Sequence, residues 1–495
     1  MSLSSGPAGK LAAGLLLAGN LAFADTLYVD NVKGSDRNTG TRDAPLSSIE
    51  RACAVVKKSG RIHVIPTGKP YSLPYGGAGN PRGLRLSTGG TAEKPLIVEG
   101  NGTTISGFAV VPPGEWKPEA EKFRALHFWP MSNHYRHSPE NYWLDANRIW
   151  FVDGQAAPNC HSREELEKTP GGFWWNKKEK QVLFHPPADR KFEELRIELP
   201  ANFGFYLQAD HIIVRNFIMV GSWNDGFDTA GNARNGLYQN CVAIGNCGQG
   251  FSAHDATNVT YEDCVTFRCA SSAICNIGTS RAVYRRCVIA ECTYEAVIHL
   301  YDDADTLFEQ CLIADPHPNE LIWLLARSSA AFVDSILIGN PDANLARTMF
   351  GSLAFINCNL LNARSVTDLS DANLTTGMTM ERCLLASLTR YAVKLPAKYH
   401  RLRLLFRENQ YAPGINFIQN GQPLPPAQLD RKALVARPVL TGIRRSEASY
   451  GDRRRSRRRG AILPESVWKN YEKWRHAEAT PAGVIFQTGD GMIND

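Results

Sequence analysis

The sequence has no long apolar run, since no segment reaches the roughly 18 uninterrupted apolar residues that a membrane-spanning helix needs. It also lacks the cysteine and histidine spacing of a zinc site, a glycine-rich phosphate loop and the nucleophile elbow of serine hydrolases. Hydrophobic residues make up 43% and charged residues 21% of the chain, as in ordinary globular proteins. We therefore expect no membrane span, and we set those three kinds of site aside.

Excess charge of one sign is scarce as well, since the net charge is only +6. Six arginines lie between residues 453 and 459, so much of the positive charge can reside in one short run. We interpret this run as a solvated linker and expect no nucleic-acid partner, with a nucleic-acid-binding tail as the alternative.

The first residues have the pattern of an export signal. Lys10 precedes the apolar stretch Leu11 to Leu17, and the small residues of Ala22-Phe23-Ala24 mark a cleavage point before Asp25. We expect residues 1–24 to be removed near Ala24 and the mature protein to be secreted or periplasmic. A disordered apolar N-terminus is the alternative.

Cysteines recur at a fixed interval through the centre of the chain. The main column is Cys241, Cys264, Cys287, Cys311, Ser335, Cys358 and Cys383, and its first intervals are 23 (264−241), 23 (287−264) and 24 (311−287). A second column is Cys247, Cys269 and Cys292. A period of this size, with short β-rich runs and no helical pattern, predicts a solenoid. Stacking at about 4.8 Å would make each column a buried ladder of reduced thiols, and disulfides between coils are the alternative.

Another strand of each coil aligns with the same period. Its middle residue is always Phe, Ile or Val and is expected to face inward, so the next residue faces solvent. The outward set is Tyr206, Asp228, Ser252, Cys275, Ile298 and Trp323. The same parity turns His299 toward the interior. We therefore predict an all-β fold, a right-handed parallel β-helix whose outward sheet can bind a ligand.

The predicted organisation has four parts after the signal. Residues 25–107 form an N-terminal cap and the first coils, 108–200 a Trp-rich β insertion, 201–394 the β-helix core, and 395–495 C-terminal strands, the Arg-rich linker and a tail. We expect a capping helix from Ser47 to Lys58, with Ser47 and Glu50 spaced as a capping box. Such a helix would cover the open end of the first coil.

The opening of the chain resembles a known superfamily. Tyr28-Val29-Asp30, the stretch Gly34 to Thr41 and Ile49-Glu50-Arg51-Ala52 resemble the start of the pectate-lyase-like superfamily of secreted parallel β-helix proteins. The stretch Trp174 to Pro186 looks like the Trp-rich strand pair inserted in its β-helical glycoside hydrolases. This resemblance implies the fold and a polysaccharide substrate more firmly than any reaction.

The turn from Asn224 to Asp228 is similar to the calcium-binding turn of family nine polysaccharide lyases. By that resemblance Asn224, Asp225 and Asp228 stand where the lyases place calcium ligands, although an asparagine weakens the site. Those lyases abstract the C5 proton with a lysine, but this sequence has no lysine between Lys191 and Lys394. Their mechanism therefore cannot be carried over unchanged.

Polar residues gather on two neighbouring coils, with Asp225 and Asp228 on one and His254 and Asp255 on the next. We expect the two aspartates to hold Ca²⁺ against the carboxylate of an acidic sugar. His254 would act as the general base, steadied by Asp255. In the alternative, Asp225 and Asp255 cap turns and His254 is an ordinary exposed imidazole.

Other residues are candidates for substrate contact. The substrate-binding set is Tyr206, Trp223, Arg281 and Trp323, since aromatic rings stack on sugars and arginine pairs with carboxylates. Glu295 and Glu320, one coil apart, would suit the close carboxylate pair of a retaining glycosidase. Asp302, Asp303 and Asp305 either bind a metal or shape a turn, and Arg327 either pairs with substrate or forms an ion pair between coils.

We therefore predict a monomeric exported enzyme that cleaves an acidic polysaccharide by calcium-assisted β-elimination. One alternative is a β-helical glycoside hydrolase that uses paired carboxylates. The other is a non-catalytic surface protein that only binds polysaccharide.

Overall fold

The computed structural model describes residues 25–77, 82–120, 122–127, 150–176, 178–179, 181–292, 296–317, 319–348, 350–370, 377–397, 402–436 and 460–486. The predicted export signal, the arginine run and Glu295 of the predicted carboxylate pair lie outside the described residues.

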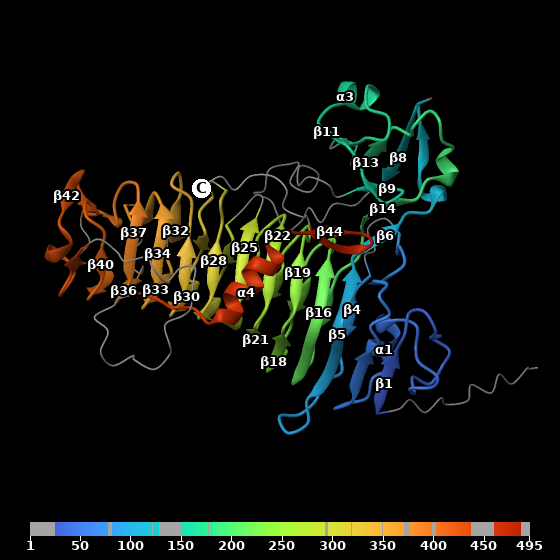
Figure 1. Ribbon diagram of the computed structural model, residues 1–495, viewed down its shortest axis with the longest axis horizontal. Helices are drawn as coiled ribbons and strands as arrows, with labels where there is room; N and C mark the ends of the chain where they lie inside the picture. Colours follow the sequence, from blue (N-terminus) through green and yellow to red (C-terminus); the bar gives the residue numbers. More distant parts are fainter. Residues whose placement is uncertain are drawn as a thin grey trace, which may run out of the picture.

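The chain is a parallel β-helix in which each coil contributes three short strands, so the predicted solenoid is confirmed (Figure 1). Wall 1 contains β18 (Gly236–Gln239), β21 (Asn258–Glu262), β24 (Arg281–Arg285), β27 (Asp305–Glu309), β30 (Ser329–Val333), β33 (Ser352–Ile356), β36 (Gly377–Glu381) and β39 (Arg403–Arg407). Wall 2 contains β19 (Val242–Ile244), β22 (Val265–Cys269), β25 (Val288–Cys292), β28 (Leu312–Ala314), β31 (Ile336–Ile338), β34 (Asn359–Ala363), β37 (Leu384–Leu388), β40 (Gln410–Tyr411) and β43 (Leu434–Val435).

Wall 3 is a separate sheet. It contains β4 (Leu84–Leu86), β15 (Phe205–Leu207), β17 (Phe227–Thr229), β20 (Phe251–Ala253), β23 (Ile274–Asn276), β26 (Ile298–Leu300), β29 (Ile322–Leu324), β32 (Asn344–Thr348), β35 (Ser365–Asp368), β38 (Val393–Leu395), β41 (Phe417–Gln419) and β42 (Gln422–Leu424). Walls 1 and 2 continue toward the N-terminus through β1 (Thr26–Val29), β2 (Arg61–Val64), β3 (Tyr71–Ser72), β5 (Leu96–Ser106) and β16 (Ile212–Val220). Solenoid strands therefore occur on both sides of residues 201–394, within residues 25–107, where the first coils were expected, and after residue 394 as far as β43.

A left-handed residue turns the chain from wall 1 into wall 2 in eight successive coils. Its φ lies between 49° and 58°, and seven of these residues directly precede the main cysteine column, whereas the last precedes Asn409: Asn240, Asp263, Arg286, Gln310, Asp334, Asn357, Arg382 and Glu408. Each thiol then donates to carbonyls on both coils, as Cys264 does to Glu262 O (3.3 Å) and Tyr238 O (3.5 Å). All twelve cysteines are free and buried, which confirms the predicted ladder of reduced thiols.

A second ladder, which the sequence analysis missed, fills the interior three residues before each thiol position. Its rings stack with centroids 4.5 to 5.3 Å apart, in the order Tyr238, Tyr261, Tyr284, Phe308, Phe332 and Phe355. The rings belong to wall 1 and face wall 3 across the core. This stack fixes the spacing of successive coils from within.

The capping helix α1 (Ile49–Val55) is shorter than predicted, and its N-cap is Ser48 instead of Ser47. The Ser48 hydroxyl accepts a hydrogen bond from Arg51 N (3.1 Å). The Asp36 carboxylate accepts hydrogen bonds from the N–H groups of both Ser47 and Ser48, which holds Ser47 in the preceding loop. The buried Ile49, Ala52 and Cys53 join α1 to the core of the first coils.

The described residues between 108 and 200 form two small sheets beside the solenoid. One contains β6 (Phe108–Val110), β9 (Phe151–Val152), β10 (Gln155–Ala156) and β14 (Ile197–Pro200). The other contains β7 (Lys117–Glu119), β8 (Phe123–His127), β11 (Asn159–Cys160), β12 (Phe173–Asn176) and β13 (Gln181–Phe184). The same part of the chain contains the helix α3 (Arg163–Glu167) and the 3-10 turns Pro113–Glu115 and Phe192–Glu194. Trp116, Trp150, Phe173 and Phe184 form their shared aromatic core.

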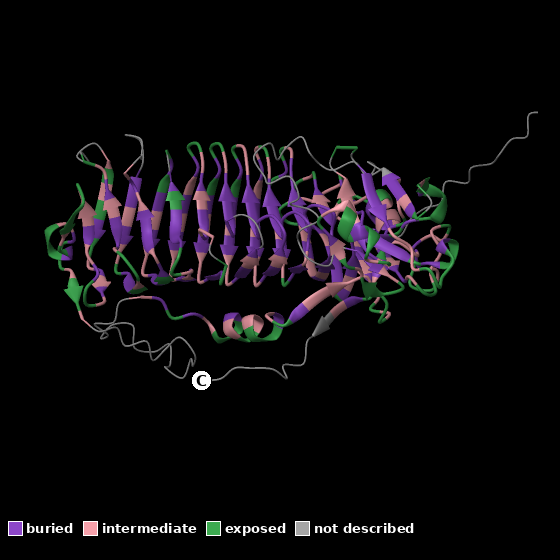
Figure 2. Cartoon of the chain, turned by 90° about the horizontal axis from the view of Figure 1, so that it is seen from above, coloured by how far each residue is buried: buried purple, intermediate pink, exposed green. Residues whose placement is uncertain are grey.

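The end of the described chain returns along the solenoid (Figure 2). Residues 460–486, here called the C-terminal strap, contain α4 (Glu465–Trp474), β44 (Ala477–Thr480) and β45 (Gly483–Phe486). Val467, Trp474 and Ala477 are buried in a cluster with outward apolar residues of wall 2. No helix in the described part of the chain is long and apolar enough to cross a membrane.

Candidate functional site

One outward column of wall 3 carries the candidate site. Its members face one another across successive strands, and we call them the outer column: Arg85, Tyr206, Asp228, Ser252, Cys275, His299, Trp323 and Arg347. The prediction was wrong by one residue at β26, where Ile298 pairs with Ile274 and is fully buried inside. This coil has one residue more than we assumed, so His299 faces outward.

The centre of the outer column is not exposed, contrary to the prediction of a solvent-facing sheet. Ser252, Cys275 and His299 are only 0%, 4% and 2% exposed. His299 packs edge-on against Trp323, with ring centroids 5.0 Å apart, and lies 4.1 Å from the Tyr301 ring. Neighbouring side chains thus enclose Ser252, Cys275 and His299. The accessible residues of the outer column lie at its two ends.

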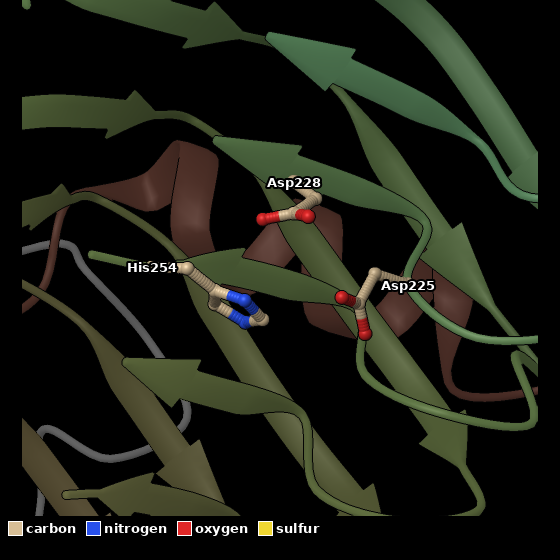
Figure 3. Close-up of side chains that lie close together, drawn as sticks. All are labelled: Asp225, Asp228 and His254. Atoms are coloured by element: carbon tan, nitrogen blue, oxygen red, sulfur yellow. The ribbon is translucent and has the colours of Figure 1, made fainter. Parts of the chain in front are cut away.

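Three predicted residues meet at one end of this column (Figure 3). Asp225, Asp228 and His254 each offer a ligand atom, and these atoms lie within 4.8 Å of one another. Asp228 belongs to β17, Asp225 to the turn before it, and His254 follows β20 on the next coil. Both aspartates are buried, whereas His254 is half-buried. We call this group the Asp–Asp–His cluster.

Ser252 links the two carboxylates of the cluster. Its hydroxyl lies 2.9 Å from Asp225 Oδ2 and 3.1 Å from Asp228 Oδ1. A hydroxyl has one proton to donate, so it cannot fully satisfy two ionised carboxylates. If one of the two carboxyl groups is protonated, it donates a hydrogen bond to the Ser252 oxygen, and the serine hydrogen is free for the other carboxylate. This arrangement favours one protonated and one ionised aspartate.

Interior tyrosines hold the strands of the site from behind. Tyr238 donates its hydroxyl hydrogen to Asp228 O and Tyr261 donates to Ser252 O, each at 2.7 Å. The next ring, Tyr284, donates to Asn276 Oδ1 (3.2 Å), and the following members of the stack are phenylalanines. The rings of the stack that carry a hydroxyl group are thus Tyr238 and Tyr261, which bond to the strands of the cluster, and Tyr284 on the next coil.

Burial and mutual charge set the protonation of the cluster. Burial and the charge of Asp228 raise the pKa of Asp225 to about 7, while His254 and the Ser252 hydrogen bond oppose the shift. Burial also raises the pKa of Asp228, again against His254. Burial lowers the pKa of His254, but the charges of Asp228, Asp225 and Asp255 outweigh it, so the net shift is upward.

One buried polar atom of the cluster, His254 Nε2, has no hydrogen-bond partner among the described residues. Asn224 Oδ1, on the residue before Asp225, is also buried without such a partner and lies beside Gly248. An unpaired buried polar atom costs free energy, and a ligand or an ion satisfies it. The cluster therefore combines two carboxylates with an imidazole nitrogen that no described residue satisfies.

Asp255 does not orient His254 in the way we predicted. Its Oδ2 accepts a hydrogen bond from Gly231 N (2.8 Å), and its own φ is 58°, so it shapes the turn that leaves wall 3. Within the described residues, no hydrogen bond joins Asp255 to His254. Asp255 acts on His254 only through its charge.

Two predicted substrate contacts lie elsewhere. Trp223, in the turn that precedes β17, is only 6% exposed and packs against Phe203. Arg281 is exposed but is the first residue of β24 on wall 1, past the turn that leaves wall 3. In the register of wall 1, Arg281 pairs with Asn258 and Asp305, so it lies off the outer column.

The remaining candidates have structural partners. Arg327 forms a bidentate ion pair with Asp303 (2.7 and 2.8 Å), and Asp302 accepts a hydrogen bond from Gly278 N (3.2 Å). Asp305 begins β27 beside Arg281. Glu320 accepts hydrogen bonds from Trp323 Nε1 (2.7 Å) and pairs with Arg347 (3.1 Å).

No protein-family model matches the chain, and no curated protein matches it. Among solved structures it is similar to the complex of XylC with xylose, at 11% identity and a TM-score of 0.48, over 82% of this chain and 86% of that one. It is also similar to pectate lyase Pel9A, at 12% identity and a TM-score of 0.46, over 76% and 78% of the two chains. A rhamnogalacturonan lyase matches at 10% identity and a TM-score of 0.39, over 78% and 87%. At such identities the likeness concerns the fold alone, so the reaction has to be argued from the site.

Proposed function

We propose that the protein is an exported enzyme that cleaves an acidic polysaccharide by β-elimination at the Asp–Asp–His cluster. The observation that carries the proposal is the buried carboxylate pair beside an imidazole nitrogen that has no hydrogen-bond partner among the described residues. Carbohydrate-active enzymes of several kinds use a parallel β-helix, and the resemblance of the opening residues to secreted members of that superfamily supports this class.

The residues of the cluster fit a calcium ion. Calcium takes oxygen ligands, and the carboxylates of Asp225 and Asp228 would supply them. Imidazole nitrogen is a poor calcium ligand, which leaves His254 for proton transfer. When bound, calcium would supply positive charge that stabilises the carboxylate of an acidic sugar.

His254 is the proposed general base. In a β-elimination its Nε2 takes the C5 proton of the sugar, the C4–O bond to the leaving sugar breaks, and a C4=C5 double bond forms. The leaving oxygen takes a proton from water, which gives a free hydroxyl group. A base must be neutral to accept a proton, and the negative charges around His254 raise its pKa. The rate should therefore rise with pH until His254 is deprotonated.

The same geometry supports a second candidate function. Asp225 and Asp228 lie within 4.8 Å of each other, and the pKa of Asp225 near 7 keeps a proton available at neutral pH. One protonated and one ionised carboxylate at a short separation suit a retaining glycoside hydrolase. In that case Asp225 would be the acid and Asp228 the nucleophile.

Product analysis distinguishes these functions. The mature protein is incubated with a panel of polyuronates and Ca²⁺, while the absorbance of unsaturated sugar and the number of reducing ends are followed. The proposal predicts both signals together. Reducing ends without absorbance would indicate the hydrolase, and retention on polysaccharide columns without any product would indicate a binding protein.

A further inference from the structure

We infer that Arg85, positioned by the Tyr206 ring, is the residue that recognises the anionic group of the substrate beside the Asp–Asp–His cluster. This inference deepens the proposed function and rests on it for the identity of the ligand. The class of ligand is a polymer that carries carboxylate or sulfate groups.

The register places Arg85 at the accessible end of the outer column. Tyr206 is paired with Arg85 on one side and with Asp228 on the other. Neighbouring parallel strands are about 4.8 Å apart, so Arg85 lies about two strand spacings from Asp228. A sugar bound over the cluster therefore lies within reach of an extended arginine.

The contact between Arg85 and Tyr206 changes what this aromatic residue offers to a ligand. The guanidinium carbon of Arg85 lies 5.1 Å from the centroid of the Tyr206 ring. A cation over a ring occupies the face on which a sugar would otherwise stack. Tyr206, predicted to stack on sugar, instead presents a positioned guanidinium, whose fork of N–H donors fits carboxylate and sulfate groups.

Arg85 is exposed and has no acidic partner among the described residues. Its charge is therefore not neutralised within this part of the chain. The charges of Asp228, Arg85 and Asp255 all act on the Tyr206 hydroxyl. This end of the outer column therefore lies next to the cluster. An anionic group is attracted to Arg85 here, whereas the two aspartates repel it in the absence of a cation.

The opposite end of the outer column provides a matched comparison. Arg347 is also exposed and lies 5.4 Å from the Trp323 ring centroid. Its Nε, however, pairs with Glu320 (3.1 Å), which also accepts the Trp323 indole hydrogen. Arg85 and Arg347 thus both lie on wall 3, are both exposed and both contact an aromatic ring. They differ in that Glu320 neutralises the charge of Arg347, whereas no described carboxylate pairs with Arg85.

The test is a binding measurement that does not require turnover. Titration calorimetry compares Arg85→Gln, Arg85→Lys and Arg347→Gln with the wild type, using polygalacturonate and alginate and their carboxyl-reduced derivatives as probes. We expect Arg85→Gln to weaken binding of the acidic polymers by roughly tenfold, with partial recovery in Arg85→Lys. Arg347→Gln should stay within about twofold of the wild type, and binding of the reduced polymers should not depend on Arg85.

Two outcomes would overturn the inference: equal affinity of wild type and Arg85→Gln for the acidic polymers, or an equal loss in Arg347→Gln. Failure of the wild type to bind either acidic polymer would do so as well. An Arg85-dependent affinity in a protein that releases no product would support the inference and refute the proposed function, so the two failures are distinguishable.

Discussion

The Asp225 carboxyl group is nearly enclosed, accepts hydrogen bonds from Ser252 Oγ and Gln249 N, and lies next to a second buried carboxylate. Two like charges in a buried site cannot both form without cost. Burial, and after it the charge of Asp228, raise the pKa of Asp225 to about 7. Protonation of one residue thus decides whether the site can attract a cation.

Calcium affinity should therefore depend on pH. Below about pH 7 the Asp225 carboxyl holds its proton, and a cation must displace it, so the affinity should rise about tenfold per pH unit until pH 7 and then level off. Titration calorimetry with CaCl₂ between pH 5.5 and 8.5, in buffers of different ionisation enthalpy, measures both the affinity and the released proton. Affinity independent of pH across this range would contradict the assignment of Asp225 as a ligand.

Substitution of His254 tests the proposed base. His254→Ala should lower the rate of elimination by about 10²- to 10⁴-fold while leaving calcium affinity nearly unchanged. His63→Ala is the control, because His63 lies on β2 of wall 1 and packs against Tyr28. Full activity of His254→Ala would remove this residue from the mechanism.

At single residues, prediction from sequence succeeded where only the coil register was needed. Asp225, Asp228 and His254 come together because residues about two dozen apart become neighbours on one wall. Parity along a strand does not say where the corner lies, so it did not show that Trp223 is buried or that Arg281 begins β24 on wall 1. The roles of Arg85 and Ser252 were not predicted, although the outer column passes through both.

The strands that carry the cluster are supported by the interior stack of wall 1. The Tyr238 hydroxyl is hydrogen-bonded to the carbonyl oxygen of Asp228 across the core. Removing that hydroxyl leaves a buried carbonyl without its partner, which costs about 1–3 kcal/mol and frees the strand to shift. Interior residues of one wall therefore position the chemistry of another.

Tyr238→Phe should lower both stability and activity, with an activity loss on the order of tenfold because Asp228 is displaced. Tyr284→Phe is the matched control, since its hydroxyl is bonded to the Asn276 side chain and not to the backbone of the cluster. The control should lose a similar amount of stability in urea unfolding but keep its activity. Equal activity of the two variants would show that the tyrosine has no positioning role.

For strands and helices, the sequence predicted the features that repeat in every coil and missed those that depend on local contacts. The cysteine period located the coils and the buried thiols, because every coil repeats one interior position. The left-handed corner before each thiol was not predicted, since residues as different as Asn240, Arg286 and Gln310 occupy it. The helix start was one residue late in the structure because Asp36, distant in sequence, holds Ser47 in the loop.

The C-terminal strap joins coils that are far apart along the solenoid. Gly460 N donates to Arg382 O, whereas Arg268 donates to the carbonyls of Arg475 and Ala477. In a solenoid each coil otherwise contacts only its neighbours, so the ends can open separately. A strap across several coils makes their opening cooperative.

Deletion of residues 460–495 should uncover the apolar outer face of wall 2, at about 1.5–3 kcal/mol for each large side chain exposed. The buried thiols report where the molecule opens, so Cys383 and Cys358 should react with an alkylating reagent before Cys241 in the truncated chain. A chain that ends at residue 486 keeps the strap and is the control. Identical labelling order and melting temperature in both chains would contradict the role of the strap.

The central claim is that substrate reacts at the Asp–Asp–His cluster on the outer face of wall 3. A crystal structure of the His254→Ala variant, soaked with Ca²⁺ and an oligomer of the polyuronate that the wild type cleaves, tests it most directly. The account predicts one ion between Asp225 and Asp228, with a sugar carboxylate beside it and C5 facing position 254. A sugar bound on another wall or within the insertion, with no ion at the two aspartates, would contradict it.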